Sequence, residues 1–223
     1  MSEASLLGRL AAAIVGLYPE RNVRVAIDGV DGAGKTTLAD ALAPVVSGHG
    51  RPTIRASVDD FHNPRAVRYA QGRHSPDGFY LDSFDYDSFR KRLLEPLSSD
   101  GSGRYFTRSF DLENDKPFEP AWQQAPPRAA LIVDGIFLHR PELRPYWDIS
   151  IFLKVNFEVS VPRGAQRGPG FGSPDPTASQ NRRYIDGQKR YFDECTPEQR
   201  ADIVIDYNDL RKPRILKWSV TNS

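Results

Sequence analysis

The segment from residue 23 to residue 37 has the residue types and the spacing of a phosphate-binding loop. It reads V-R-V-A-I-D-G-V-D-G-A-G-K-T-T, a strand-like apolar run followed by the pattern G-x-x-x-x-G-K-T. Glycines let such a loop turn tightly and point its N–H groups inward, and the helix that follows offers the positive end of its dipole to the same anion. We therefore predict that phosphate groups of a nucleotide bind to Gly29, Asp31, Gly32, Ala33, Gly34, Lys35, Thr36 and Thr37.

Three of these residues have distinct expected roles. Lys35 should reach the β- and γ-phosphates, and the Thr36 hydroxyl should ligate Mg²⁺. Thr37 is expected behind Thr36, where it shapes the first helical turn. The alternative is a glycine-rich turn without a ligand, but strand, loop and amphipathic helix occur here in the order that the motif requires.

A second chemical signal is the apolar run A-L-I-V-D-G at residues 130–135, which ends in the acid Asp134. A buried strand that ends in this way can deliver a carboxylate beside the phosphate loop. Because Mg²⁺ prefers oxygen ligands, Asp134 is a candidate to bind the metal directly or through water. The alternative is that Asp134 caps the turn that follows the strand.

The third signal is Asp59-Asp60-Phe61-His62, which ends the second predicted strand. Ligands of open α/β sheets collect at the carboxyl ends of the strands. Asp59 could therefore accept the proton of an attacking hydroxyl and share the field of the Mg²⁺ ion. Asp60 is the competing candidate for the base. His62 is expected to contact the substrate, with an ordinary surface histidine as the alternative.

The elements that must position these residues alternate between strands and helices. Apolar strand-like runs lie at residues 23–27, 53–58, 129–133, 149–155 and 202–205. This alternation predicts an α/β fold, a doubly wound parallel sheet, in a single domain that covers residues 1–223. Helical spacing is found after the phosphate loop and between residues 84 and 97. Two segments rich in turn residues, 63–82 and 166–177, are expected to be mobile loops.

Composition narrows the class of protein. The 223 residues contain 30 basic and 29 acidic side chains, so a net charge of +1 gives no global field for nucleic acid or an anionic membrane. No apolar run is long enough to cross a membrane, and the apolar residues between Leu6 and Leu17 have helical spacing, which favours a packing helix over an export signal. The single Cys195 fits a reducing compartment, so we expect a cytoplasmic protein. The sequence leaves open whether it forms a homo-oligomer.

Taken in order, G-x-x-x-x-G-K-T, D-D-F-H and I-V-D-G-I-F-L resemble the uridine kinase and phosphoribulokinase-like group of P-loop kinases, over roughly residues 23–205. The resemblance implies ATP and Mg²⁺ as cofactors and Asp59 as the base toward a nucleoside 5′-hydroxyl. It also implies an acid that binds the ribose hydroxyls, for which Asp85 is preferred and Asp82 is the alternative. A base-binding hairpin would correspond to residues 104–111, with Tyr105 and Phe110 as substrate contacts.

The same resemblance implies a substrate-binding insertion at about residues 63–116 and a lid at about residues 163–183. In the family, lid arginines close on ATP and neutralise the transferring group. Arg167 matches that lid arginine best and Arg163 is second; the two are four residues apart and so share one face of a helix. Arg182 and Arg183 could substitute for them. Residues 206–209 fall where such kinases pass the adenine.

The sequence therefore predicts an ATP-dependent kinase that phosphorylates a hydroxyl of a small molecule, with a pyrimidine nucleoside as the leading acceptor. Pantothenate, a sugar phosphate or another small alcohol is the alternative within the kinases. A P-loop NTPase that acts as a switch is the alternative of another class, although no N-K-x-D guanine-recognition motif is found. A nucleotide-binding protein without transfer chemistry is a third. ATP and GTP are not distinguished as donors.

Overall fold

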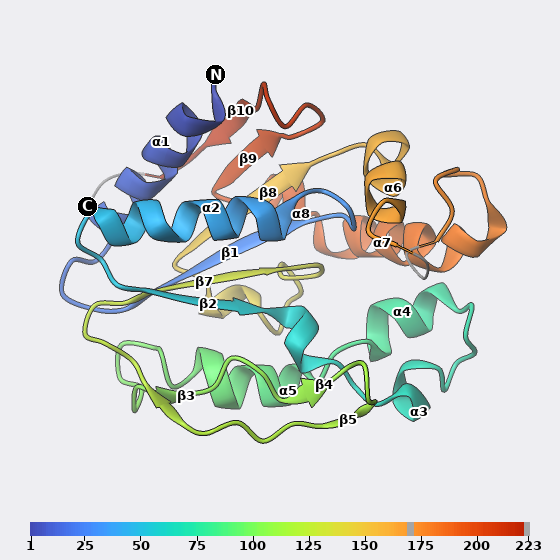
Figure 1. Cartoon of the computed structure of the whole chain (residues 1–223), viewed down its shortest axis with the longest axis horizontal. Helices are drawn as coiled ribbons and strands as arrows, with labels where there is room; N and C mark the ends of the chain where they lie inside the picture. Colours follow the sequence, from blue (N-terminus) through green and yellow to red (C-terminus); the bar gives the residue numbers. More distant parts are fainter. Residues whose placement is uncertain (169–171, 221–223) are drawn as a thin grey trace.

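A six-stranded sheet with the order β10-β9-β8-β1-β7-β2 lies at the centre of the computed structural model, which describes residues 1–168 and 172–220 (Figure 1). Its strands are β1 (Val23–Gly29), β2 (Thr53–Ser57), β7 (Ala130–Gly135), β8 (Ile149–Lys154), β9 (Ile203–Asp206) and β10 (Arg214–Trp218). All neighbouring pairs are parallel except β9 with β10, which is antiparallel. The predicted doubly wound α/β sheet is confirmed, with β10 as an additional edge strand.

The register of the sheet brings the candidate acids to one edge. Ser57 at the end of β2 lies opposite Asp134 on β7, and Asp134 lies opposite Ile27 on β1. Because all three strands run in the same direction, the phosphate loop, Asp134 and the segment after β2 leave the sheet side by side. This is the edge at which ligands of open α/β sheets bind.

Two helices cover one face of the sheet. These are α1 (Glu3–Gly16) and α2 (Lys35–Gly48), which lie along the same side in Figure 1. Leu6, Leu10 and Ile14 of α1 are fully buried, so the N-terminal apolar run is a packing helix, as its spacing predicts. Alternate residues of β1 and β7 complete this half of the core, as expected for strands whose side chains point to opposite faces.

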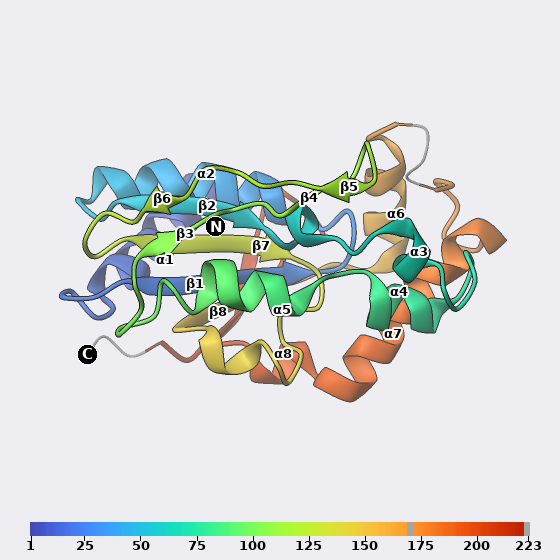
Figure 2. The same ribbon diagram turned by 90° about the horizontal axis from the view of Figure 1, so that it is seen from below.

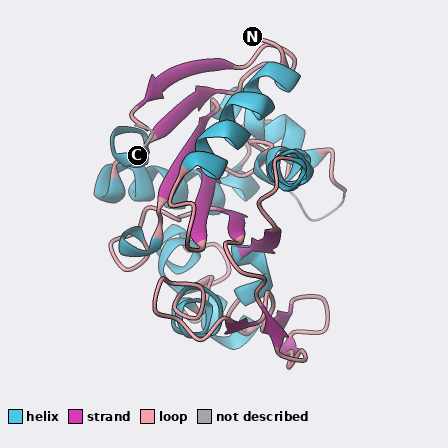
Figure 3. Ribbon diagram, turned by 90° about the vertical axis from the view of Figure 1, so that its left-hand side faces the viewer, coloured by secondary structure: helices cyan, strands magenta, loops and turns pink. Residues whose placement is uncertain are grey.

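The opposite face carries α4 (Pro76–Asp82), α5 (Tyr86–Phe89), α7 (Arg182–Cys195) and α8 (Pro197–Arg200), as seen in Figure 2. The helix predicted between residues 84 and 97 is present, but after α5 it continues as a π-helical turn, η2 (Arg90–Leu94). Phe89, Leu93 and Leu94 are fully buried on this face. Figure 3 shows the twisted sheet with helices on both sides.

The region between β2 and β7 contains more regular structure than its turn residues suggest. It begins with the 3₁₀ turn η1 (Val58–Phe61) and α3 (Arg65–Arg68), so that the predicted mobile loop at 63–82 contains α3 and α4. Two small antiparallel pairs follow, β3 (Arg104–Tyr105) with β6 (Gln123–Gln124) and β4 (Phe110–Asp111) with β5 (Lys116–Pro117).

The segment between β8 and β9 supplies the second group of elements near the phosphate loop. After β8 the chain forms α6 (Phe157–Ala165), and a short 3₁₀ turn, η4 (Ser179–Asn181), leads into α7. Part of the loop predicted at 166–177 lies outside the described residues. In Figure 1, α3, α4, α6 and α7 gather at the end of the sheet where the loop between β1 and α2 lies. No helix in the described part of the chain is long and apolar enough to cross a membrane.

Candidate active site

The phosphate loop has the backbone geometry of an anion cradle. Gly32 and Gly34 have φ angles of 73° and 94°, in the left-handed region that glycine adopts without strain. Gly34 is the N-cap of α2 and offers no side chain to cap it, so the first-turn amides are left for an anion. Lys35 is buried, and its Nζ donates to the Val30 carbonyl oxygen at 2.8 Å, inside the curve of the loop. This geometry fits nucleotide phosphates.

Helix α6 touches the phosphate loop at Gly32. A Cβ atom built on Gly32 would lie 2.1 Å from the carbonyl oxygen of Ser160 and 3.0 Å from the backbone nitrogen of Gly164. Only glycine can therefore bring the loop this close to α6. The contact fixes the distance between the phosphate loop and the helix that begins the predicted lid.

Asp134 lies at the end of β7 beside the first turn of α2. Its Oδ2 accepts a 2.6 Å hydrogen bond from the Thr36 hydroxyl, and its Oδ1 pairs with the Arg55 guanidinium at 2.8 Å. Asp134 is only 1% exposed, so Arg55 balances a carboxylate that would otherwise be buried without a cation. This pairing of carboxylate and hydroxyl fits a Mg²⁺ ion that Thr36 ligates while Asp134 orients the hydroxyl or a bound water.

Asp59 lies in η1, the turn that follows β2 directly. Its backbone N–H donates to the Ser57 hydroxyl oxygen at 3.3 Å, and that hydroxyl donates to the backbone oxygen of Asp134 at 3.2 Å. The Asp59 carboxyl is accessible through the pocket described below. Desolvation by the surrounding protein raises its pKa, against the lowering effect of Lys35; Asp134 raises the pKa further, and Arg167 lowers it. The carboxyl therefore lies in the combined field of all three groups.

Asp60 is in a different environment. Its carboxyl is 3.6 Å from the guanidinium of Arg108, and both side chains are partly exposed. It is absent from the residues that line the pocket beside the phosphate loop. Among the two neighbouring acids, the geometry favours Asp59 as the base.

One cavity of about 450 Å³ connects the phosphate loop with Asp59. Asp31 and Gly32 form its wall on the side of the phosphate loop, and Arg167 also lines it. Much of the remaining wall is aromatic or apolar, from the insertion, the segment after β7, α4, α6 and α7: Tyr69, Phe79, Phe84, Leu112, Ile136, Phe157 and Tyr184, beside His62. Polar residues complete it, among them Arg68, Asn181, Arg183 and Gln188. A molecule in this cavity would have one end at the phosphate loop and the other against aromatic rings.

His62 is held in one orientation at this wall. Its ring lies 4.6 Å from that of Phe84, centroid to centroid, and its Nδ1 is 2.6 Å from the Asp59 carbonyl oxygen. Burial lowers the pKa of His62 to about 4, so the ring is neutral at physiological pH. Since a carbonyl can only accept, Nδ1 carries the proton and Nε2 is left as an acceptor.

The two predicted lid arginines have different surroundings. Arg167 lines the cavity, and its positive charge lowers the pKa of both Asp31 and Asp59. Arg163 instead donates to the backbone oxygens of Tyr207, at 3.1 Å, and of Asn208. The structure thus places Arg167 beside the candidate base and Arg163 against the segment predicted to pass the adenine.

Comparisons with known proteins agree with this geometry, although no protein-family model matches the sequence. A uridine kinase from Lactiplantibacillus plantarum is 24% identical over 192 residues, which cover 80% of this chain and 88% of that protein. The structure of a possible uridine kinase from Bacillus stearothermophilus superposes with a TM-score of 0.71 at 22% identity, over 90% of this chain and 97% of the other. Phosphoribulokinase from Rhodobacter spheroides has a TM-score of 0.57 at 16% identity, over 91% of this chain and 76% of that chain.

The sequence and the fold of this chain thus resemble those of uridine kinase and phosphoribulokinase-like P-loop kinases. Kinases of this kind use ATP and typically Mg²⁺, and the cradle and the pair of Thr36 and Asp134 described above are suited to both.

Several residues that were predicted to contact the acceptor in this P-loop kinase lie away from the cavity. Asp85 is the N-cap of α5, and its Oδ1 accepts from the Ser88 N–H at 2.8 Å. Asp82 Oδ2 accepts from the Gln71 amide at 2.8 Å. Neither carboxylate lines the cavity, so the structure does not bring it to Asp59.

The aromatic residues of the expected base-binding hairpin are also placed elsewhere. Tyr105 is 5% exposed and packs in the core on the face of the sheet opposite α1 and α2. Its hydroxyl donates to the Gln123 side-chain oxygen at 3.1 Å. Phe110 is 4% exposed in β4. The structure brings neither to the cavity, because the two strands form separate small pairs instead of one hairpin over the site.

The cavity wall contains residues that the sequence did not single out. Tyr69 comes from the segment after α3, whereas Tyr184 and Gln188 come from α7. The Arg183 guanidinium lies 5.0 Å from the centre of the Tyr69 ring. The high content of Arg and Tyr in residues 63–82 was the one sign in the sequence that this segment could bind a ligand. Its contact with α7, which lies far away in the sequence, could not be predicted from that composition.

Proposed function

We propose that this P-loop kinase transfers the γ-phosphoryl group of ATP to a hydroxyl of a small molecule, most specifically the 5′-hydroxyl of a pyrimidine nucleoside. The observation that carries the proposal is the cavity that has the phosphate loop and Arg167 at one end, Asp59 beside them and an aromatic wall beyond. Such a cavity accommodates an acceptor next to the transferring group, which a nucleotide-hydrolysing switch does not need.

The proposed chemistry is positioning with charge neutralisation. Asp59 accepts the proton of the acceptor hydroxyl and orients its oxygen toward the phosphate loop. Lys35 and Arg167 offset the negative charge of the phosphoryl group during transfer. Bound Mg²⁺, held by Thr36 with Asp134 behind it, supplies further charge neutralisation on the phosphates.

The hydrogen bonds that the cavity's arginines already make favour an uncharged acceptor over a sugar phosphate or pantothenate. Arg68 donates to the Asn63 carbonyl oxygen at 2.7 Å and to Asp115 at 3.1 Å. Arg183 donates to four backbone oxygens between residues 68 and 75. Three arginines are among the described residues that line the cavity: Arg68, Arg167 and Arg183. Arg167, at the phosphate end, is the one for which no hydrogen bond of this kind to a described residue is found.

The remaining wall suits a nucleoside. Aromatic rings provide flat apolar surfaces against which a base can pack. The neutral His62 presents Nε2 as an acceptor, which matches a hydroxyl or N–H donor and disfavours a carboxylate or phosphate. Together with the similarity to uridine kinases, these features make uridine and cytidine the first acceptors to test.

The test is ADP release from ATP and Mg²⁺ across uridine, cytidine, other nucleosides, pantothenate and sugar phosphates. With the true acceptor, Asp59→Asn should lower kcat by roughly 10²- to 10⁴-fold, the usual contribution of a positioned base. Asp60→Asn is the matched control and should change kcat only a few-fold. A pantothenate or sugar phosphate response would replace the nucleoside, and acceptor-independent hydrolysis unchanged by Asp59→Asn would replace the kinase with an NTPase.

A further inference from the structure

Helix α7 both lines the acceptor cavity and bonds the phosphate loop. Its first two turns contribute Arg183, Tyr184 and Gln188 to the cavity wall. It also packs closely on α4, since a Cβ atom on Gly187 would lie 2.8 Å from the Phe79 ring. A ligand in the cavity would therefore contact α7 directly.

The first link from α7 to the phosphate loop is the side chain of Gln188. Its Oε1 accepts the backbone N–H of Asp31 at 2.7 Å, and its Nε2 donates to the Tyr184 carbonyl oxygen at 2.9 Å. Gln188 is only 3% exposed, so both ends of the amide have their partners in a largely dry environment. The position of the Asp31 amide thus depends on a side chain that also lines the acceptor cavity.

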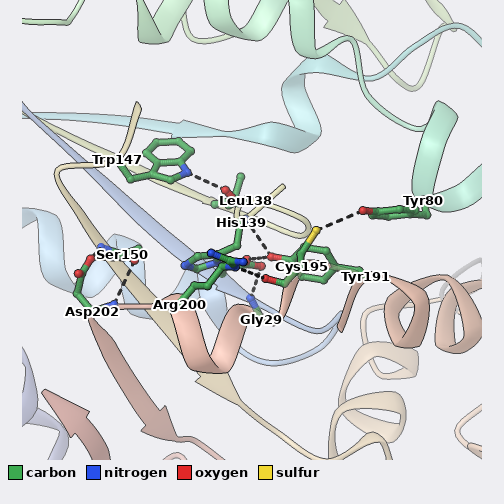
Figure 4. A network of polar contacts seen from close by, with 11 residues as sticks. Gly29, Tyr80, Leu138, His139, Trp147, Ser150, Tyr191, Cys195, Arg200 and Asp202 are labelled. Atoms are coloured by element: carbon green, nitrogen blue, oxygen red, sulfur yellow. Dashed lines mark hydrogen bonds and ion pairs between the residues drawn. The ribbon is translucent and has the colours of Figure 1, made fainter. Parts of the chain in front are cut away.

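The second link is one helical turn further along, at Tyr191 (Figure 4). Its hydroxyl donates to Asp28, the last residue before the first glycine of the phosphate loop, and accepts from the His139 N–H at 2.9 Å. The Asp28 carboxylate also bonds the Gly29 N–H and the His139 ring, both at 2.7 Å. Asp28 and Tyr191 are almost fully buried, so this link anchors α7 under the loop.

We propose that α7 couples the acceptor cavity to the phosphate loop, with Gln188 as the positioning residue that carries the coupling and Tyr191 as the fixed anchor. An acceptor that packs against Tyr184 and Gln188 would stabilise the orientation in which Gln188 holds the Asp31 N–H, and so the shape of the loop that binds the nucleotide. Because such coupling is reciprocal, nucleotide bound at the loop must affect α7 in return. The inference rests on the proposed function.

The coupling can be measured from the donor side with AMP-PNP and Mg²⁺ alone. In the wild type, AMP-PNP should slow amide hydrogen exchange in the phosphate loop and also in residues 184–192. Gln188→Leu removes the bond to Asp31 at similar side-chain volume. It should weaken AMP-PNP binding about five-fold, the equivalent of one net hydrogen bond, and abolish the slowing in α7 while the slowing in the loop persists at saturation.

Two further variants make the result specific. Gln188→Glu keeps an oxygen that can accept the Asp31 N–H, so it should restore part of the slowing in α7. Lys189→Leu changes the exposed neighbouring residue on the same helix and should leave both regions as in the wild type. If Gln188→Leu does not fold, Gln188→Glu and Tyr191→Phe are measured in its place. Tyr191→Phe should lower the Tm clearly while it changes the Kd of AMP-PNP little.

Slowing of the phosphate loop without slowing of α7 in the wild type would overturn the coupling and leave the kinase proposal intact. Undiminished slowing of α7 in Gln188→Leu would assign the coupling to other contacts and overturn the role of Gln188. An AMP-PNP effect on neither region would contradict the donor site itself, and with it the proposed function.

Discussion

Gly32→Ala tests whether the close approach of the phosphate loop to α6 is required. The new Cβ would lie 2.1 Å from the Ser160 carbonyl oxygen, about 1 Å inside the closest approach that Cβ atoms make. The backbone φ of 73° adds strain for any residue other than glycine. Because the clashing atom is backbone, a side-chain rotation cannot relieve it.

The expected cost follows from these two contributions. The left-handed conformation costs a non-glycine residue about 1–2 kcal/mol. Overpacking of a tight contact typically costs a further 1–3 kcal/mol or so. The sum, roughly 2–5 kcal/mol, corresponds to a fall in Tm on the order of 10 °C for a chain of this size. If α6 or the loop moves to relieve the clash, part of the cost will appear as weaker nucleotide binding.

The assay is thermal unfolding together with calorimetric titration of AMP-PNP. Gly164→Ala is the matched control, because it adds the same methyl group to the other side of the same contact. A Cβ atom there would meet only the Gly32 Cα, at 4.0 Å, which is an ordinary contact. Since Gly164 lies in a helix, alanine should leave Tm unchanged or raise it slightly.

Both measurements are needed to refute the reasoning. If Gly32→Ala has the Tm and the AMP-PNP affinity of the wild type, neither the strain nor the close approach to α6 is a property of the molecule in solution. Equal losses in Gly32→Ala and Gly164→Ala would show that the contact tolerates no added atom on either side, and the difference in geometry would then not explain the result.

Three further predictions concern the acids and the histidine of the site. The kcat/KM should fall as pH drops through the Asp59 pKa, which burial raises above 3.8, because the protonated carboxyl cannot act as base; a profile flat to about pH 4 would contradict this. His62 has a pKa of about 4 in the folded state and 6.5 in the unfolded state. The free energy of unfolding therefore keeps its full contribution from the neutral ring above pH 6.5, and loses about 3 kcal/mol as the pH falls from 6.5 to about 4. Between pH 7 and pH 5 the loss should be about 2 kcal/mol in urea titrations, and His62→Gln should remove it. An unchanged loss would place the titrating group elsewhere. Asp85→Ala should cost about 1 kcal/mol as a lost N-cap without changing the KM of the acceptor, and a large rise in that KM would bring Asp85 to the substrate after all.

The parts of the fold that could be predicted from sequence are those with a local pattern. The phosphate loop has a fixed spacing, and the central parallel strands β1, β7 and β8 are largely apolar and buried on both faces, whereas β2 alternates between buried and half-buried residues. Asp59 and Asp134 could be placed at the same edge because parallel strands end together. Strand β10 was missed, since Arg214–Trp218 is a half-exposed edge strand that lacks a continuous apolar run.

The acceptor wall was harder to predict because its members are brought together only by tertiary packing. Tyr69 and Tyr184 lie on separate elements more than a hundred residues apart, and no periodicity relates them. The pattern around Tyr105 and Phe110 looked like an aromatic binding surface, but both side chains are buried in short strand pairs. Arg55 was missed for a similar reason: a charged residue within a strand gives no sign of the carboxylate that it will pair with on the next strand.

The phosphate loop is contacted on two sides by the two helices that contain the ends of the predicted lid. Helix α6, in which the lid begins, touches Gly32 through the Ser160 backbone, and α7, in which it ends, bonds the neighbouring Asp31 through Gln188. Both contacts involve the backbone of the loop, so neither leaves a mark in the G-x-x-x-x-G-K-T pattern. Any rearrangement of the lid that moves either helix must therefore change the loop at adjacent residues. We expect donor binding and lid position in this kinase to be inseparable, and variants at Gly32 and Gln188 to alter both.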